Sequence, residues 1–153
     1  RKMPIEKFTW LCMPYLSKAH FIHTQSNDYL EHVIALEQPR LKKLSEITEK
    51  VDYFFKEFAY DKELLRWKAI TDDEIRESLN MAINLLQENQ EKNITEIERI
   101  FLEQASVMGD KGKFLWPLRV ALTGKKNSPG PFEIIYILGI KEAIERLIRA
   151  INA

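Results

Sequence analysis

Cysteine, long apolar runs and catalytic signatures are scarce in this chain, and each shortage excludes a class of protein. With a single cysteine, Cys12, among 153 residues, the chain forms no internal disulfide, which favours a reducing compartment. No apolar run approaches the roughly 18 residues that a membrane-spanning helix needs. We therefore expect a soluble, cytoplasmic protein with no membrane partner.

The sequence contains no CxxC, HExxH, GxGxxG or GxSxG pattern. The stretch 124–126 (Gly-Lys-Lys) is not a phosphate-binding loop, because the first glycine and the final Ser or Thr of that motif are missing. His20 and His23, with Cys12 and His32 nearby, could be zinc ligands, but their irregular spacing favours ordinary surface or packing histidines. We predict no catalytic residue and no metal site.

Apolar residues recur at helical spacing almost throughout, and the alternation typical of strands is scarce. This pattern predicts an all-α fold. No repeat or flexible linker interrupts it, and we expect two small helical subdomains, residues 1–64 and 65–153, with a boundary that is soft by several residues. The expected helices cover residues 5–16, 29–37, 39–55, 72–86, 96–108, 117–123, 131–138 and 140–151.

Turn and capping residues set these boundaries. Asn27-Asp28 is a plausible N-cap for the second helix, and Pro39 suits the first turn of the third. Thr71 with Glu74, and Thr95 with Glu98, have the spacing of a capping box. Three later glycines are expected to end or pivot helices: Gly109, Gly124 and Gly139.

Charge is balanced over the whole chain but segregated along it. Lys plus Arg number 23, as do Asp plus Glu. Residues 61–104 hold eleven acids and six bases, whereas residues 111–126 hold five bases and no acid. A local basic surface of this kind can contact phosphate without a basic total, although a solvated Lys-rich turn explains the composition equally well.

The basic stretch leads into a stiff loop. Pro117 suits the first position of a short helix that Gly124 ends. In Ser128-Pro129-Gly130-Pro131, two prolines fix φ, and the glycine permits a conformation that other residues resist. Such a loop loses little entropy on ordering and could hold an unstacked RNA base.

The string 117–124 (Pro-Leu-Arg-Val-Ala-Leu-Thr-Gly), a polar spacer, 128–133 (Ser-Pro-Gly-Pro-Phe-Glu), then Leu138-Gly139 and a final amphipathic helix resembles the C-terminal region of bacterial-type glutamyl-tRNA synthetases, a class I family. The resemblance extends upstream through 37–40 (Glu-Gln-Pro-Arg). It implies an all-helical part that binds the anticodon of glutamate tRNA. The chain opens at Arg1 without a start Met, and we expect a fragment of a larger synthetase.

The resemblance also implies what this piece does not do. The family's ATP-handling signatures, His-Ile-Gly-His and Lys-Met-Ser-Lys-Ser, are absent from the chain. We therefore expect no aminoacylation and no cofactor here. The parent would be an ATP- and Mg-dependent glutamate–tRNA ligase whose catalytic domain is a partner of this region, and we expect a monomer.

The resemblance assigns the anticodon contacts by position. Unstacked bases can stack on aromatic or guanidinium planes and form hydrogen bonds on their pairing edges. The positions that border the anticodon pocket in the family match Trp116, Arg119, Ser128, Pro129, Pro131 and Phe132, and we add a supporting basic patch of Lys111, Lys113, Lys125 and Lys126. Pro131 stands where relatives often have Leu, and Trp116 where Gln or a smaller residue is common. Core packing remains the alternative for Trp116.

Arg40 carries the sharpest hypothesis. The family has an arginine at this position when it distinguishes glutamate tRNA, whose third anticodon base is C, from glutamine tRNA, which ends in G. A guanidinium offers only donors, which suit the O2 and N3 acceptors of cytosine but face N–H donors on guanine. A solvated arginine in a first helical turn is the alternative.

A rival function comes from a different class. A helical protein–protein interaction module with no RNA role would also be all-α. It predicts weak salt dependence of binding, and an exposed aromatic patch without neighbouring Lys or Arg. RNA binding predicts a steep loss of affinity as salt rises.

Overall fold

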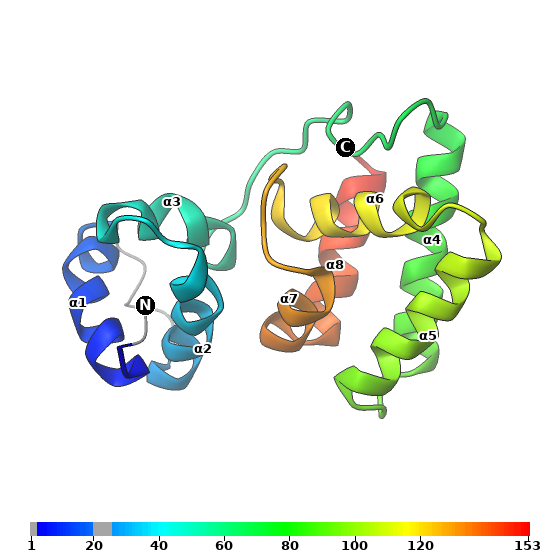
Figure 1. Ribbon diagram of the computed structural model, residues 1–153. Helices are drawn as coiled ribbons and strands as arrows, with labels where there is room; N and C mark the ends of the chain where they lie inside the picture. The colour runs from blue at the N-terminus through cyan, green and yellow to red at the C-terminus, as the bar shows by residue number, and fades with distance from the viewer. Residues whose placement is uncertain (1–2, 20–25) are drawn as a thin grey trace. The chain divides into compact units, whose positions relative to one another are not determined.

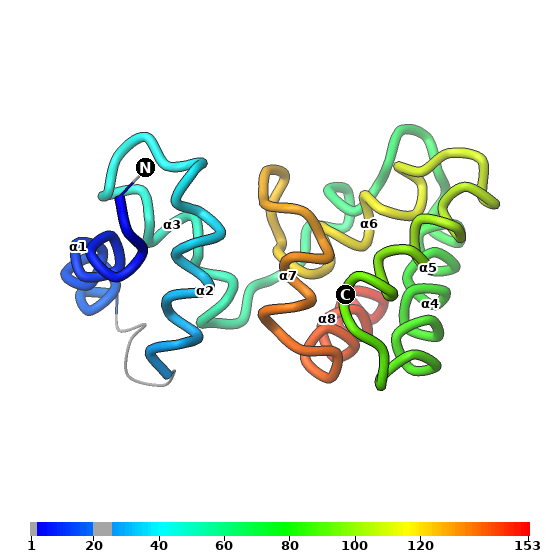
Figure 2. The backbone as a smooth tube through the Cα atoms, turned by 60° about the horizontal axis from the view of Figure 1, so that its bottom comes forward, coloured from blue at the N-terminus to red at the C-terminus, as the bar shows by residue number. Residues whose placement is uncertain are grey.

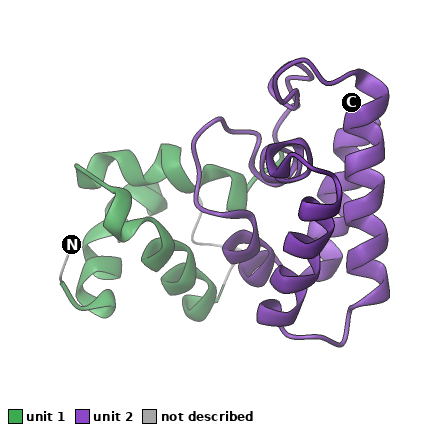
Figure 3. Cartoon of the chain, turned by 45° about the vertical axis from the view of Figure 1, so that its right-hand side comes forward, with its two compact units in different colours: residues 1–57 green, residues 58–153 purple. Residues whose placement is uncertain are grey.

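The computed structural model describes residues 3–19 and 26–153, and every regular element in these two ranges is helical (Figure 1). The all-α expectation is confirmed. Two compact units form, residues 1–57 and 58–153 (Figure 3), where the sequence partition places the boundary after residue 64. His20 and His23, the histidines considered as zinc ligands, lie outside the described residues.

The first unit packs short helices around one apolar core. Its α-helices are α1 (Ile5–Lys18), α2 (Asn27–Glu37) and α3 (Ile47–Val51), and its 3-10 turns are η1 (Gln38–Arg40), η2 (Leu44–Glu46) and η3 (Asp52–Phe54). The chain winds α2 and α3 against α1, as the tube in Figure 2 shows. Apolar side chains at helical spacing are buried on all three: Phe8, Cys12, Leu16, Leu30, Val33, Ile34, Ile47 and Val51.

The prediction of one continuous helix over residues 39–55 is wrong. Pro39 lies inside a single 3-10 turn, η1, after which Leu41 is extended (φ −79°, ψ 137°) and the chain continues through η2, α3 and η3. Most of its apolar positions are nevertheless buried, Leu41 and Phe54 among them. Helical spacing therefore identifies the buried face here but not the continuity of the helix.

The second unit contains α4 (Asp72–Glu88), α5 (Ile94–Val107), α6 (Lys111–Thr123), α7 (Pro131–Leu138) and α8 (Ile140–Ile151). Helix α4 packs against α5, α6 and α8, and α6 crosses α4 and α8 steeply (Figure 1). Phe101 of α5 stacks on Phe114 of α6 with ring centroids 5.5 Å apart in the core. This stacking contact holds α6 against α5 in the core of the second unit.

Local capping explains the helix starts, with two corrections. At α4, Thr71 and Glu74 form the expected capping box. At α5, the N-cap is Asn93, whose Oδ1 accepts from the Glu96 backbone N–H at 2.9 Å, instead of Thr95. Ser26 caps α2 in place of Asn27-Asp28. In both cases another good capping residue lies just upstream of the expected one.

The hinge between α7 and α8 falls at Gly139 as expected, with φ +85°. Farther along α8, the buried side chain of Arg146 donates from Nε to Glu142 at 2.9 Å and from Nη1 to the Leu122 carbonyl at 2.8 Å. Burial raises the pKa of Glu142, but the hydrogen bond and charge of Arg146 outweigh it and leave that pKa lowered. Arg146 thus ties α8 to the last turn of α6.

Among the described residues, no helix combines the length and apolar character needed to cross a bilayer. Within residues 3–19 and 26–153, no three His, Cys, Asp or Glu side chains gather as metal ligands would.

Candidate nucleic-acid interface

Helix α6 carries two of the predicted contacts and is longer than expected. It begins after Asp110, whose Oδ1 accepts from the Gly112 N–H at 3.0 Å, so Pro117 lies inside the helix and its prediction as a first helical residue is wrong. Proline has no N–H for the carbonyl four residues earlier, that of Lys113. The buried Ser78 hydroxyl on α4 donates to this carbonyl at 3.0 Å instead. An interior proline is tolerated here because a neighbouring helix supplies the missing donor.

The structure brings together Trp116, Arg119 and Ser128, three of the predicted contacts. The Arg119 guanidinium carbon lies 5.0 Å from the Trp116 ring centroid, since residues three apart share a helix face. Arg119 Nη1 donates to Ser128 Oγ at 2.9 Å, and this hydroxyl donates to the Pro129 carbonyl at 2.9 Å. The result is a continuous series of contacts from an aromatic ring through a guanidinium to the stiff loop.

Trp116 also contacts a residue that the sequence interpretation missed. The Trp67 ring lies 5.7 Å from that of Trp116, and Trp116 Nε1 donates to the Leu64 carbonyl at 2.7 Å. Trp67 Nε1 donates to Asp110 Oδ2 at 3.0 Å, and this bond leads the effects that lower the Asp110 pKa. A tryptophan followed by a lysine in a stretch without helical spacing is the signal that could have drawn attention to this segment.

The segment 58–71, which precedes α4, forms hydrogen bonds with α6 and its N-cap along the length of the helix (Figure 1). Near its start, the Tyr60 hydroxyl donates to the Ala121 carbonyl at 2.6 Å, and burial raises the Tyr60 pKa. Near its end, the Trp67 ring lies so close to Gly112 that a Cβ there would be 2.2 Å from Trp67 Cε2. The orientation of α6 is therefore set by contacts at both ends.

The loop that follows α6 begins at Gly124, as expected. Gly124 has φ +69°, and its N–H donates to the Val120 carbonyl at 2.7 Å. A Cβ at this position would lie 2.5 Å from Phe58 Cδ1, so both the backbone and the space demand glycine. This turn directs the chain into the loop that holds Ser128.

The last three predicted contacts, Pro129, Pro131 and Phe132, differ in how far they are buried. Pro129 is buried, and Pro131 is half-buried at the start of α7. Phe132 is only 8% exposed, and its ring meets Phe101 edge-on at 5.7 Å. Its side chain belongs to the core, where it anchors α7 and the loop.

The four lysines of the predicted basic patch also differ in exposure and in their partners. Lys111 and Lys126 are exposed. Lys125 is half-buried, and its backbone N–H donates to Thr123 Oγ1. Lys113 Nζ lies 2.8 Å from Glu74 Oε2. This hydrogen bond lowers the Glu74 pKa to about 2 and raises the pKa of Lys113, so the Lys113 charge is balanced locally.

Arg40 belongs to the first unit, and the other predicted contacts belong to the second. It ends η1, its side chain is 38% exposed, and its Nε lies 3.4 Å from Oε1 of the buried Glu37. A buried carboxylate needs a charged or hydrogen-bonding partner. The pair holds the guanidinium at the surface in a defined position.

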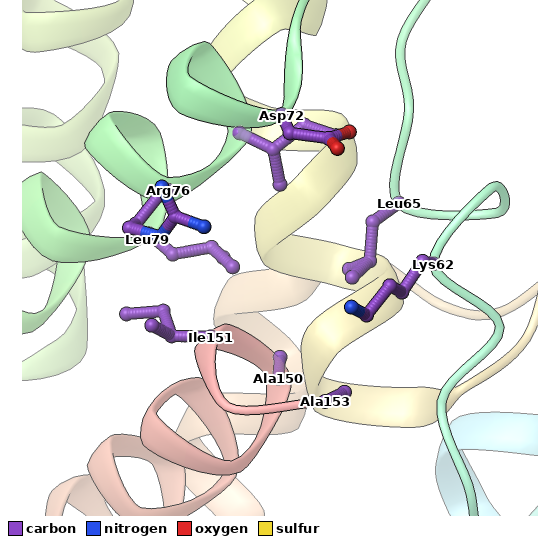
Figure 4. Close-up of a pocket in the computed structure, with 9 residues that line it drawn as sticks. Lys62, Leu65, Asp72, Arg76, Leu79, Ala150, Ile151 and Ala153 are labelled. Carbon is purple, nitrogen blue, oxygen red and sulfur yellow. The ribbon is translucent and has the colours of Figure 1, made fainter.

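A small surface pocket elsewhere in the second unit contains none of the predicted residues. Lys62, Arg76 and Asp72 form its polar rim over an apolar floor, and α4 and the end of α8 supply most of its wall (Figure 4). This pocket is therefore separate from the candidate interface, which follows α6 and the loop after it.

Sequence and structure both relate the chain to known proteins. A family profile described as an anticodon binding domain matches residues 7–151. The glutamate–tRNA ligase of Clostridium acetobutylicum is 33% identical over 151 residues, which cover 96% of this chain and 30% of that protein. Glutamate–tRNA ligase 1 of Caldicellulosiruptor saccharolyticus is 31% identical, covering 94% and 30%.

Solved structures share the fold. The glutamate–tRNA synthetase of Elizabethkingia anophelis aligns with a TM-score of 0.76 at 19% identity, over 99% of this chain and 29% of that one. A glutamate–tRNA ligase from Elizabethkingia meningosepticum aligns with a TM-score of 0.74 at 21% identity. The chain thus spans about 30% of the length of the relatives that it matches.

Proposed function

We propose that this chain, which belongs to the anticodon-binding domain family, binds the anticodon loop of glutamate tRNA as part of a glutamate–tRNA ligase. The observation that carries the proposal is the series Trp116–Arg119–Ser128 on α6 and its following loop. Its three members lie in the segment whose motif resembles the synthetase family.

The geometry suits an unstacked base. A base can stack on the Trp116 ring or on the Arg119 plane, and stacking of this kind contributes about 1–3 kcal/mol per base. A guanidinium carries five N–H donors in a planar fork, a geometry that suits the acceptor atoms on a base edge. Because the ring and the loop are braced before RNA arrives, little ordering entropy opposes binding.

The remaining loop residues have supporting roles in this proposal. Phe132 and Pro129 hold the loop from the core side, and Pro131 starts α7. Lys111, Lys125 and Lys126 supply charge for the RNA backbone. Lys113 acts mainly within the fold through Glu74.

We propose further that Arg40 favours C over G at the third anticodon base. The ion pair with Glu37 engages Nε and orients the planar fork, and guanine would face it with N–H donors. Unpaired buried donors cost about 1–3 kcal/mol each, which corresponds to about 5- to 150-fold discrimination.

Aminoacylation belongs, in this proposal, to the larger protein. The chain spans about 30% of its relatives, so we assign ATP, Mg²⁺ and the activation of glutamate to a catalytic domain that this region accompanies in the cytoplasm. We propose that the chain contributes recognition only, as a monomer.

A titration with unmodified glutamate and glutamine tRNA transcripts at about 50 and about 200 mM salt tests RNA binding. We expect tighter binding of glutamate tRNA and a steep loss of affinity at the higher salt. Arg119→Gln should weaken binding to both transcripts, whereas Arg99→Gln, on the exposed side of α5, is the matched control. Salt-independent binding, or none, would favour the rival protein-interaction module.

Arg40 needs its own experiment, because removing it also leaves Glu37 without this ion pair. Arg40→Gln and the double variant Arg40→Gln/Glu37→Gln should both lose the preference for C-ending over G-ending anticodon stem-loops. Lys43→Gln removes an exposed charge nearby and should weaken both equally. Selectivity that survives in the two Arg40 variants would rule out this role.

A further inference from the structure

Lys68 adopts a backbone conformation that its side chain does not favour. Its φ is +54°, and it is the one non-glycine residue with positive φ among residues 3–19 and 26–153. Glycine and asparagine adopt this region far more readily than lysine. Strained positions of this kind cluster at functional sites, so the identity of the side chain needs an explanation.

The fold does not supply that explanation. Lys68 is 70% exposed, and its Nζ lies 3.9 Å from Asp110 Oδ2, at the limit of an ion pair between partly exposed groups. Asp110, 45% exposed, already accepts from the Gly112 and Trp67 N–H groups. The N-cap of α6 is therefore complete without the lysine.

The surroundings of Lys68 instead match one end of the candidate interface. Its ammonium lies 5.2 Å from the Trp67 ring centroid, and Trp67 lies against Trp116, which in turn lies against Arg119. A lysine therefore lies over one ring, and an arginine over the other, of two neighbouring tryptophans. Surfaces that bind single-stranded RNA combine cationic groups for the phosphates with aromatic rings for the base faces.

We propose that Lys68 binds a backbone phosphate of the RNA strand that contacts Trp116 and Arg119, and so extends the RNA-binding surface past the anticodon residues. The inference rests on the proposed function, because it needs RNA on the α6 surface. The loose contact with Asp110 lets the ammonium move to a phosphate at low cost. A phosphate contact raises affinity without reading sequence.

Lys68→Gly separates this role from a structural one. Glycine suits the positive φ, so the melting temperature should equal or exceed that of the unaltered chain. Affinity for an anticodon stem-loop should nevertheless fall about fivefold at about 50 mM salt, and the slope of log K against log salt should shrink by about 0.7–0.9. Lys68→Gln should show the same loss of affinity, and the preference for C over G should not change in either variant.

Lys92→Gln is the matched control. Lys92 follows the C-terminal end of α4 and Lys68 precedes its N-terminal end, so the helix of 17 residues separates them by about 25 Å. The control should bind like the unaltered chain. Unchanged affinity and salt slope in Lys68→Gly, while the unaltered chain binds RNA, would overturn the inference alone. If the unaltered chain binds no RNA, the proposed function and this inference both fall.

Discussion

The clearest test of how the sequence builds the α6 surface is a double-mutant cycle between Ser78 and Pro117. Pro117 removes the N–H that would bond the Lys113 carbonyl, and Ser78 replaces it with a 3.0 Å hydrogen bond. Ser78→Ala leaves this carbonyl without that donor, at a cost of about 1–3 kcal/mol, which the better helix propensity of alanine offsets by about 0.5 kcal/mol. We expect a net loss of about 1–2 kcal/mol.

In a Pro117→Ala background the backbone N–H of residue 117 is restored, so Ser78→Ala should cost about 0.5 kcal/mol or less. The two substitutions should therefore show a coupling energy of about 1–2 kcal/mol, whatever Pro117→Ala does alone.

Urea unfolding followed by tryptophan fluorescence measures this coupling. Trp67 and Trp116 report on the second unit, and Trp10, which is 73% exposed in the first unit, can be replaced by Phe to remove its signal. Additivity within about 0.3 kcal/mol would show that Ser78 does not compensate for the proline, and would refute this explanation of an interior proline.

Three further perturbations follow from single contacts. Gly124→Ala should lower stability by about 2–4 kcal/mol in chemical denaturation, because a Cβ meets Phe58 at a positive φ; a loss below about 0.5 kcal/mol would contradict this. The Glu74 pKa is lowered to about 2, so its pairing with Lys113 stabilises the fold above about pH 4.5 and this contribution is lost as the pH falls toward 2. Glu74→Gln should flatten this part of the stability–pH curve, and an unchanged curve would exclude the pair as its source. Burial raises the Cys12 pKa to about 11, so an aromatic disulfide reagent at pH 8 should react at least about 100-fold more slowly with the folded chain than in denaturant; equal rates would mean that the thiol is not buried.

Helix identity followed from apolar spacing, but helix boundaries depended on contacts that spacing does not encode. The capping box at Thr71 is local and was predicted, as was the pivot at Gly139. The interior position of Pro117 depends on a hydroxyl 39 residues earlier in the chain, on another helix. The spacing of residues along the chain contains no such partner, so it does not predict the first half of α6.

The candidate site shows the same division. Trp116 and Arg119 could be predicted to meet because they lie three apart on one helix, and the loop returns Ser128 to them. The family resemblance marked Phe132 by position but did not give the direction of its ring, which the core determines. Trp67 and Lys68 lie in a segment without periodicity, and only the folded chain brings them to Trp116.

Nuclease or chemical footprinting of a full-length glutamate tRNA transcript shows which nucleotides this chain contacts. We expect the chain to protect the three anticodon nucleotides and adjoining phosphates, and to leave the cleavage of the acceptor stem unchanged. Arg119→Gln should weaken the protection of the anticodon nucleotides. Protection confined to the acceptor stem, or a tRNA cleaved identically with and without saturating protein, would contradict anticodon recognition by this chain.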